Sequence, residues 1–224
     1  MRRAVLGYGI DRLAIVKTAL LGQAQPLWSF VPPRSRGHLD FGEQFPYDPE
    51  KARALLKEAG CDAQNLLLYT LMTHGAEASL PIIVTVMKTQ LAQSAVEVTV
   101  EVLERPIFLR RVTRDRNWDQ FLANAAVTIN PYTISQGIDR RAGNNAINHA
   151  DPQVEALIDR MREAATEEAY LQAGYDFQRY VVENMMNTSV SSYSHLQAVR
   201  IYVQGYENLH GYKLRFETTW LDKP

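Results

Sequence analysis

A run of valines at alternate positions constrains the fold of this chain more than any other feature. Residues 96–102 read VEVTVEV, so valine and polar side chains would fall on opposite faces of an extended strand. A period of two is typical of a strand that is buried on one face and exposed to solvent on the other. We therefore predict a half-buried strand at 96–102.

The segments around this strand predict an α/β layer. The apolar run LLLYTLM at 66–72 has the length of a strand covered on both faces, and residues 79–94 carry apolar side chains at helical spacing. A second helix is predicted from Pro106 to about 116, and a third strand at 119–129. The order strand, helix, strand, helix, strand implies crossover helices packed on a sheet.

Two Asp-Pro pairs mark helix starts outside this layer. Asp48-Pro49 offers an N-cap oxygen and a proline at the first helical position, and Gly60 supplies a left-handed stop. Asp151-Pro152 predicts a second capped helix. The other expected elements are a helix at 2–21, a long aromatic-rich connection at 23–47, a loop at 130–150, a helix at 167–187 and β-like segments from 189 onward.

Composition argues against several classes of function. The chain has 224 residues, of which 46% are hydrophobic and 22% charged, as in an ordinary globular protein with a real core. The net charge of −1 argues against a nucleic-acid binder, because phosphates need a basic surface. One cysteine, Cys61, excludes an internal disulfide and a multi-cysteine metal site. The sequence contains no run of about eighteen apolar residues, so it predicts no membrane-spanning helix.

The sequence also lacks the common catalytic motifs. It contains no nucleophile elbow, no phosphate-binding loop, no zinc-protease pattern and no dinucleotide glycine fingerprint. The five histidines are scattered, and we expect each of them on the surface or in a loop rather than at a metal. A pair of carboxylates assembled by the fold could still act as acid and base, although no particular pair is indicated.

Several segments resemble, in order, the pattern of a known family. Residues 1–12 are similar to its "R-x-A-x-x-Y-A-I-D-R" helix, and YDPEKARALLKEAG at 47–60 is similar to its "Y-D-P-x-K-A-K-x-L-L-x-E-A-G" helix. Further segments at 96–112, 151–166 and 203–221 resemble its later strand and helix patterns and its "V-K-G-Y" ending. The chain thus resembles the second half of the family 5 extracellular solute-binding proteins, the dipeptide, oligopeptide and nickel receptors of ABC importers.

This resemblance implies a fold and a domain organisation. Residues 1–198 would form the second, C-terminal lobe of a periplasmic-binding-protein type II fold, an α/β lobe with a mixed sheet flanked by helices. Residues 199–224 would form a β-rich segment that returns to the first lobe. On this interpretation the chain is a fragment. The missing N-terminal lobe would carry the signal peptide of a periplasmic or extracellular protein.

The resemblance also implies a function that involves no bond breaking. Such receptors trap a small solute, peptide-like or another small organic molecule, between two lobes that close about a hinge. The closed form then docks on the membrane permease. The expected partners are therefore the solute, the ABC permease and the missing lobe, and no nucleic acid. Neither an enzymatic activity nor a cofactor nor a metal is expected.

One segment departs from the pattern of the peptide-binding members. In those members the strand that matches 119–129 is followed by an acid-rich stretch, in which an acidic residue anchors the ammonium group of the peptide. This chain reads LANAAVTINPYT, with Val127 near the place of that acid. A buried ammonium group without a counter-charge is costly. Recognition of an ordinary peptide N-terminus is therefore not expected.

Polar residues around this departure are the candidate contacts of a more neutral or anionic solute. Asn124 stands where the family has a tryptophan, and Asn130-Pro131-Tyr132 stands where it has Asp-Pro-Asp. His74 is expected in the loop after the first sheet strand. The predicted ligand-binding residues are His74, Asn124, Thr128, Asn130 and Tyr132. The alternative for each of them is a role in packing or in capping a turn.

Two other classes of function stay open at this point. The first is an enzyme whose carboxylate or histidine site is assembled by the fold, and turnover in a substrate screen would reveal it. The second is a protein-interaction module, suggested by the aromatic loop at 23–47, which would bind a partner stably without any effect of small molecules. The sequence does not identify the ligand in any of these cases.

Overall fold

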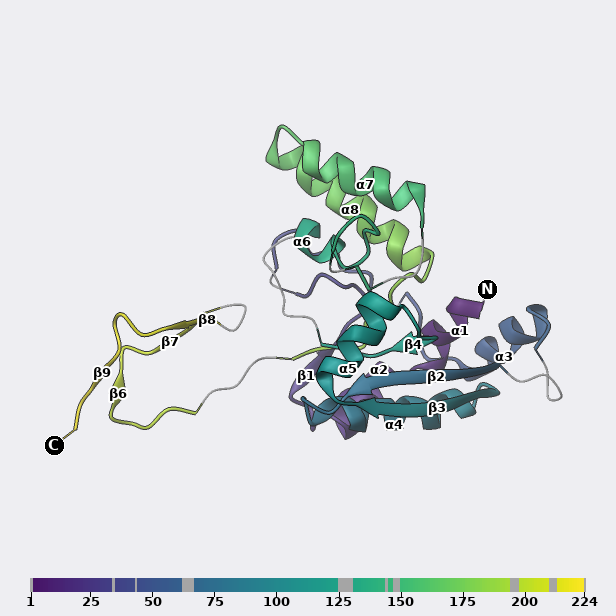
Figure 1. Cartoon of the computed structure of the whole chain (residues 1–224), viewed down its shortest axis with the longest axis horizontal. Coiled ribbons are helices and arrows are strands. Elements are labelled where there is room, and N and C mark those ends of the chain that lie inside the picture. The colour runs from purple at the N-terminus through teal and green to yellow at the C-terminus, as the bar shows by residue number, and fades with distance from the viewer. Residues whose placement is uncertain are drawn as a thin grey trace.

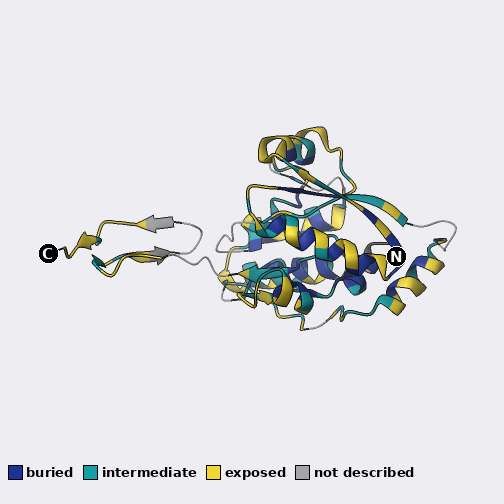
Figure 2. Ribbon diagram, turned by 90° about the horizontal axis from the view of Figure 1, so that it is seen from below, coloured by how far each residue is buried: buried dark blue, intermediate teal, exposed yellow. Residues whose placement is uncertain are grey.

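The computed structural model of the protein describes residues 2–33, 35–42, 44–61, 67–124, 131–143, 145–146, 150–193, 198–209 and 213–223. A body with a three-stranded sheet and several helices contains most of these residues, and a slender tail lies to one side of it (Figure 1). Buried side chains line the inward faces of the helices in the body (Figure 2).

Three parallel strands form the central sheet, in the predicted order of strands and crossover helices. They are β2 (Leu67–His74), β3 (Val96–Leu103) and β4 (Gln120–Phe121), and β2 lies in the middle. β2 pairs with β3 along its whole length, from Leu67 opposite Val96 to His74 opposite Leu103. Since the strands are parallel, their carboxyl ends point to the same edge of the sheet.

The crossover helices cover opposite faces of this sheet. Helix α4 (Ser79–Ala92) joins β2 to β3, and its Val84 and Leu91 pack in one core with Leu71. Helix α5 (Arg105–Leu109) and the following π-helical turn η1 (Arg110–Asp115) join β3 to β4. Their residues Phe108 and Val112 form a second core with Met72. Leu71 and Met72 are neighbours in the strand, so they point to opposite faces.

The two long strands of the central sheet, β2 and β3, are each buried along part of their length and exposed at one end. Val96 and Val98 are buried, whereas Val102 at the far end of β3 is 49% exposed. In β2 the second half is buried on both faces, but Leu68 is 65% exposed. The prediction of a half-buried β3 is therefore confirmed, and that of a doubly covered β2 holds for its second half alone.

The third strand is much shorter than the sequence suggests. A strand was expected at 119–129, but β4 contains only two residues, Gln120 and Phe121. Residues 122–124 continue without strand structure, and residues 125–130 lie outside the described part of the chain. The apolar pattern overestimates the strand, although the amide of Leu122 still donates to the carbonyl oxygen of Met72 at 2.9 Å.

The N-terminal segment forms two helices instead of the single helix predicted at 2–21. Helix α1 (Arg2–Gly9) ends before Asp11, and helix α2 (Arg12–Thr18) begins after it. The side chain of Asp11 accepts a hydrogen bond from the amide of Ala14 at 2.8 Å. Asp11 therefore acts as an N-cap that starts a new helix, which is the usual preference of aspartate at such a position.

The two Asp-Pro helices form as predicted. In α3 (Pro49–Glu58) Asp48 accepts a hydrogen bond from the amide of Lys51 at 2.8 Å, and Gly60 has a φ of +80° just after the helix. In α7 (Pro152–Glu163) Asp151 accepts from the amide of Gln153. Cys61 is buried after α3 and is a free cysteine.

A second helical unit packs beside the sheet. Helices α7 and α8 (Glu167–Glu183) lie side by side, and α6 (Pro131–Ser135) lies near them in Figure 1. Their common core includes Ile138, Leu157 and Phe177. The sequence predicted a loop over 130–150, so α6 corrects that prediction. Pro131 favours a helix start because it fixes φ and has no amide hydrogen to leave unpaired.

Short antiparallel ribbons make up the rest of the chain. β1 (Ala24–Pro26) pairs with β5 (Ser191–Tyr193) at the side of the body from which the tail extends (Figure 1). In the tail, β6 (Val203–Gln204) pairs with β9 (Trp220–Leu221), and β7 (Glu207–Leu209) pairs with β8 (Lys213–Arg215). These ribbons agree with the β-like pattern expected after 189.

No helix in the described part of the chain is long and apolar enough to cross a membrane.

Candidate functional site

The carboxyl edge of the central sheet gathers polar residues from three segments. β2 ends there at His74, and the turn that follows contains Glu77. Asn124 lies three residues beyond β4 at the same edge. In open α/β sheets ligands bind outside the carboxyl ends of the strands. We therefore take this edge as the candidate functional site.

Backbone contacts fix the segments that make up this edge. The hydroxyl of Thr73 donates to the carbonyl oxygen of Leu122 at 2.9 Å, and the amide of Gly75 donates to the carbonyl oxygen of Leu103 at 3.1 Å. Thr73 and Gly75 flank His74, and Leu122 leads to Asn124. The ends of β2, β3 and β4 are thus tied together, so the side chains after them are held in defined places.

Glu77 connects two of these side chains. The amide nitrogen Nδ2 of Asn124 donates to Oε1 of Glu77 at 2.7 Å, and the hydroxyl of Tyr193 donates to Oε2 at 3.0 Å. Asn124 follows β4 and Tyr193 ends β5, so one half-buried carboxylate joins residues that are 47 and 116 positions away in the sequence. We call these three residues the Glu77 clasp.

The clasp also fixes the orientation of the Asn124 carboxamide. An ionised carboxylate has acceptors only, so the NH₂ group of Asn124 must face Glu77. The oxygen Oδ1 of Asn124 then points away from Glu77 as an acceptor. Of the residues that the structure describes, none donates a hydrogen bond to this oxygen. The site therefore offers acceptors, an amide oxygen and a carboxylate, at the edge of the sheet.

His74 is buried at this edge, which corrects the expectation of a surface or loop histidine. It is the last residue of β2 and its side chain is only 4% exposed. Its ring meets the ring of Phe108 edge to face, with 5.1 Å between the centroids. The atom Nδ1 is buried and has no hydrogen-bond partner in the described part of the chain. The side chain is buried because it points to the face of the sheet that α5 covers.

Tyr132 lies away from these residues, on α6 beside α7 and α8. Its amide donates to the hydroxyl of Tyr170 at 3.2 Å, and its carbonyl oxygen accepts from the hydroxyl of Ser135 at 2.7 Å. Its side chain packs against the core of the helical unit. Burial raises the pKa of Tyr170, so this hydroxyl stays protonated near neutral pH. The contacts made by Tyr132 are those of a packed, structural residue.

The remaining predicted contacts cannot be placed in this geometry. Thr128 and Asn130 lie outside the residues that the structure describes, as does Val127, on which the expectation about ammonium recognition rests. The structure therefore brings His74 and Asn124 to one edge of the sheet and places Tyr132 on another element. The role of Thr128 and Asn130 stays a prediction.

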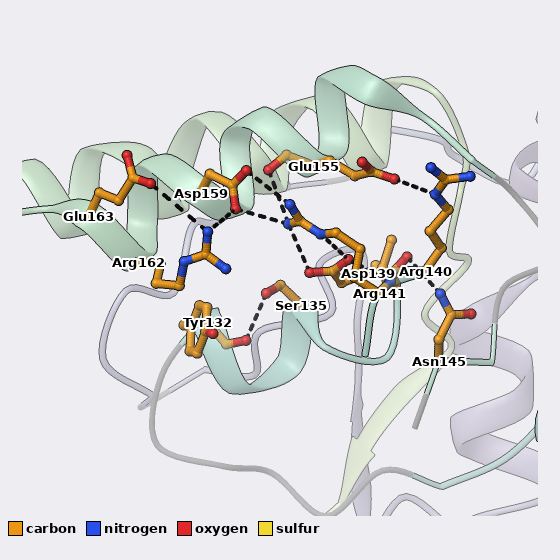
Figure 3. A network of polar contacts seen from close by, with 11 residues as sticks. Tyr132, Ser135, Asp139, Arg140, Arg141, Asn145, Glu155, Asp159, Arg162 and Glu163 are labelled. Carbon is orange, nitrogen blue, oxygen red and sulfur yellow. Dashed lines mark hydrogen bonds and ion pairs between the residues drawn. The ribbon is translucent and has the colours of Figure 1, made fainter. Parts of the chain in front are cut away.

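An ion-pair network lies in the helical unit, next to Tyr132 (Figure 3). The guanidinium group of Arg141 donates to both oxygens of Asp139, at 2.9 and 3.0 Å, and to both oxygens of Asp159, at 3.0 and 2.9 Å. These hydrogen bonds from Arg141 lower the pKa of Asp139 and of Asp159. The network joins the turn after α6 to α7, and each of its charges has a partner.

No group of three or more metal-ligating side chains that could hold an ion occurs in the described ranges. The polar residues at the sheet edge come from separate segments and include one carboxylate, one amide, one phenol and one imidazole. Such a set can recognise hydrogen-bond donors of a small molecule, because each of these groups can accept a hydrogen bond.

Comparison with known proteins shows the family to which the chain belongs. The model of the bacterial extracellular solute-binding proteins, family 5 (middle region), matches residues 1–146. The chain belongs to this family. It is 36% identical over 103 residues to the glutathione-binding protein GsiB of Salmonella typhimurium, a match that covers 46% of this chain and 19% of GsiB.

Solved structures of the family have the same fold. The oligopeptide-binding protein AppA of Bacillus subtilis, solved with a nonapeptide, superposes with a TM-score of 0.88 over 99% of this chain and 47% of AppA, at 20% identity. Haemophilus influenzae OppA, solved with the peptide RPPGFSPFR, gives a TM-score of 0.85 over 99% of this chain and 45% of OppA, at 18% identity. The predicted α/β lobe of the type II fold is thereby confirmed. The chain spans about half the length of these structures.

Two members of the clasp were missed in the sequence analysis of this family 5 chain. Tyr193 gives no signal, because only the fold brings β5 beside the turn after β2. Glu77 gives a weak one: it is a polar residue just beyond the end of a predicted parallel strand, where functional side chains tend to lie. His74, three residues earlier, stands at the same strand end and was the residue predicted from the sequence.

Proposed function

We propose that this chain forms one lobe of the substrate-binding component of an ABC importer. The whole receptor captures a small peptide-like solute, or another small organic molecule, between two lobes and delivers it to the membrane permease. Family membership and the relatives' binding of glutathione and peptides support this proposal. The family is one of extracellular solute-binding proteins, and we propose a periplasmic or extracellular location with export by a signal peptide.

The observation that carries the proposal is the Glu77 clasp at the carboxyl edge of the sheet. It presents a carboxylate and an amide oxygen on segments held by backbone hydrogen bonds, so the acceptors are in place before any solute arrives. A prearranged site loses less conformational entropy on binding. Binding without bond cleavage needs such positioned acceptors and no nucleophile or general acid.

The domain organisation is part of the same proposal. Residues 1–198 make the second lobe, and residues 199–224 pair with the first lobe. The solute lies between the lobes, and closure about the connecting segments covers it. In this arrangement Asn124 faces the solute from the second lobe, the contacts of Thr128 and Asn130 stay predictions, and the buried His74 and the packed Tyr132 act through the packing described above.

The proposal is tested by a thermal-shift screen of the full-length gene product that contains this chain. The screen compares glutathione, dipeptides, sugars, aromatic acids and nickel. A ligand that binds only the folded protein raises its melting temperature in proportion to the logarithm of its concentration. We expect a concentration-dependent rise with at least one peptide-like solute. A flat response to the whole panel, or turnover of a solute during incubation, would contradict a transport receptor.

A further inference from the structure

The carboxylate of Glu77 has no cationic partner in the described part of the chain. Its two oxygens accept hydrogen bonds from an amide and a phenol, which are both neutral groups. None of the ion pairs found among the described residues involves Glu77. Each oxygen still has room for a second hydrogen bond, because a carboxylate offers about four acceptor sites. The charge is thus positioned but not neutralised.

The position of Glu77 is typical of a residue that binds a ligand and not of a residue in a stabilising ion pair. Glu77 follows the end of the central strand β2, at the edge where α/β sheets bind ligands. The ion pairs of the helical unit, by contrast, join carboxylates directly to arginines, as between Arg141 and Asp159. A half-buried carboxylate held in place by two neutral donors keeps its charge available for a cation from outside.

Asn124 adds a second acceptor beside this charge. Since its NH₂ group faces Glu77, its Oδ1 atom is turned to the other side of the carboxamide. An ammonium group has three N–H donors, so it can contact a carboxylate oxygen and an amide oxygen at the same time. Hydrogen bonds between a cationic donor and an ionised carboxylate are about twice as strong as neutral ones.

We propose that Glu77, with Asn124 beside it, determines the specificity of the candidate site by binding an ammonium group of the solute. This inference rests on the proposed function and names the chemical class of its solute. The acidic residue that binds the ammonium group is then Glu77, which follows β2, whereas Val127 comes after β4 in the sequence. The inference therefore leads to the opposite expectation from the one drawn from Val127, which lies outside the described residues.

The experiment measures binding of paired probes to the full-length gene product by isothermal titration calorimetry. The probes are glutathione and dialanine, each with a free amine and in its N-acetylated form. Acetylation removes the positive charge and two N–H donors but leaves the rest of the probe unchanged. For the wild type we expect at least one free-amine probe to bind about tenfold or more tightly than its acetylated partner.

Glu77→Gln supplies the second measurement, since it removes the charge and keeps the size of the side chain. We expect the preference for the free amine to disappear, with the affinity for the acetylated probe unchanged. Glu97→Gln is the matched control: Glu97 is an exposed glutamate on β3, away from the carboxyl end of the strand, and the preference should persist. Melting curves establish that both variants fold.

The possible results separate this inference from the proposed function. Equal binding of free and acetylated probes by the wild type overturns the role of Glu77 and supports the expectation from Val127, while the receptor function stands. An equal loss of affinity for both probe forms in Glu77→Gln also overturns it, because Glu77 would then only shape the site. The absence of binding by every probe overturns this inference, while the proposed function is decided separately by the thermal-shift screen.

Discussion

Arg12 is a buried cation whose hydrogen-bond partners are backbone carbonyl oxygens. Its side chain is 4% exposed, and its Nε donates to the carbonyl oxygen of Ser189 at 2.9 Å. Its Nη1 donates to the carbonyl oxygen of Gly7 at 3.2 Å, with Ile10 and Phe45 at 3.5 Å. Burial lowers the pKa of Arg12 to about 10, so the side chain remains charged at neutral pH. One side chain thus holds the end of α1, the aromatic loop and the segment before β5.

Replacement of this side chain should destabilise the protein strongly. Arg12→Met keeps much of the volume but leaves the carbonyl oxygens of Gly7 and Ser189 without donors in a buried place. Each unsatisfied group costs about 1–3 kcal/mol, so we expect a loss of about 2–4 kcal/mol in the free energy of unfolding, measured with urea. Arg105→Met, at an exposed position, should change it by less than about 0.5 kcal/mol. A loss of under about 1 kcal/mol for Arg12→Met would contradict this role.

The candidate site shows what the sequence reveals about single residues and what it does not. His74 was predicted from its place after a predicted strand, and Asn124 from the resemblance to the family, in which a tryptophan stands at its place; the structure puts both at the carboxyl edge of the sheet. The burial of His74 depends on the packing of Phe108 from α5, which no local pattern encodes. The contact of Glu77 with Tyr193 depends on β5, 116 residues further along the chain. Long-range contacts of this kind follow from the fold.

Helix caps act at the level of the single element, and α3 provides a clean test. Asp48 accepts a hydrogen bond from the amide of Lys51 at 2.8 Å, and this bond satisfies an amide that has no partner inside the helix. Asp48→Ala should lower the free energy of unfolding by about 1 kcal/mol in urea titrations. Asp48→Asn retains an acceptor and should stay within about 0.5 kcal/mol of the wild type. Equal losses for both variants would assign the effect to charge instead of the cap.

The Arg141 network predicts a pH dependence for the contact between the turn after α6 and α7. Arg141 holds the pKa of Asp139 and of Asp159 below the ordinary value, mainly through hydrogen bonds to their side chains. The folded protein therefore binds fewer protons than the unfolded chain near pH 4. The resulting stability is fully present above the unfolded pKa of about 3.9 and is lost as the pH falls through the lower pKa values of the folded state.

Arg141→Met should remove this pH-dependent stability. Urea titrations between pH 7 and pH 3 should show the wild type more stable than the variant at neutral pH, with the difference shrinking below about pH 4. Arg114→Met serves as the control, since Arg114 is exposed on η1. Its difference from the wild type should be small and independent of pH. A constant difference for Arg141→Met over the whole pH range would contradict the argument.

At the level of the element, local sequence signals predicted the helices and the strand whose formation depends on local interactions. Asp-Pro caps and the valine alternation gave α3, α7 and β3 close to their observed bounds. The break at Asp11 and the short α6 were not predicted, because an amphipathic stripe continues across a cap and a five-residue helix is too short to show a helical period. The length of β4 depends on pairing with β2, which apolar composition cannot reveal.

The whole molecule combines two packed units with a tail that has little core of its own. One core surrounds the sheet and α4, and another lies between α7 and α8. In the tail the strands β6 to β9 pair with one another as two short ribbons. Several large apolar side chains among its described residues are exposed, including Ile201, Phe216, Trp220 and Leu221. Isolated two-stranded ribbons are marginally stable in water, so the tail needs a further surface to become rigid.

This difference between body and tail predicts a pattern of hydrogen exchange. In the chain of residues 1–224, the amides of β3 open only with the core, whereas those at 203–207 and 215–221 have few buried contacts to protect them. We expect the tail amides to exchange at least about 100-fold faster than those of β3. Under the proposed domain organisation a first lobe covers Trp220 and Leu221 in the full-length gene product, and exchange in the tail should slow markedly there. Equal protection of tail and β3 in the 224-residue chain would show that the tail is already anchored, and would remove the reason to assign it to another lobe.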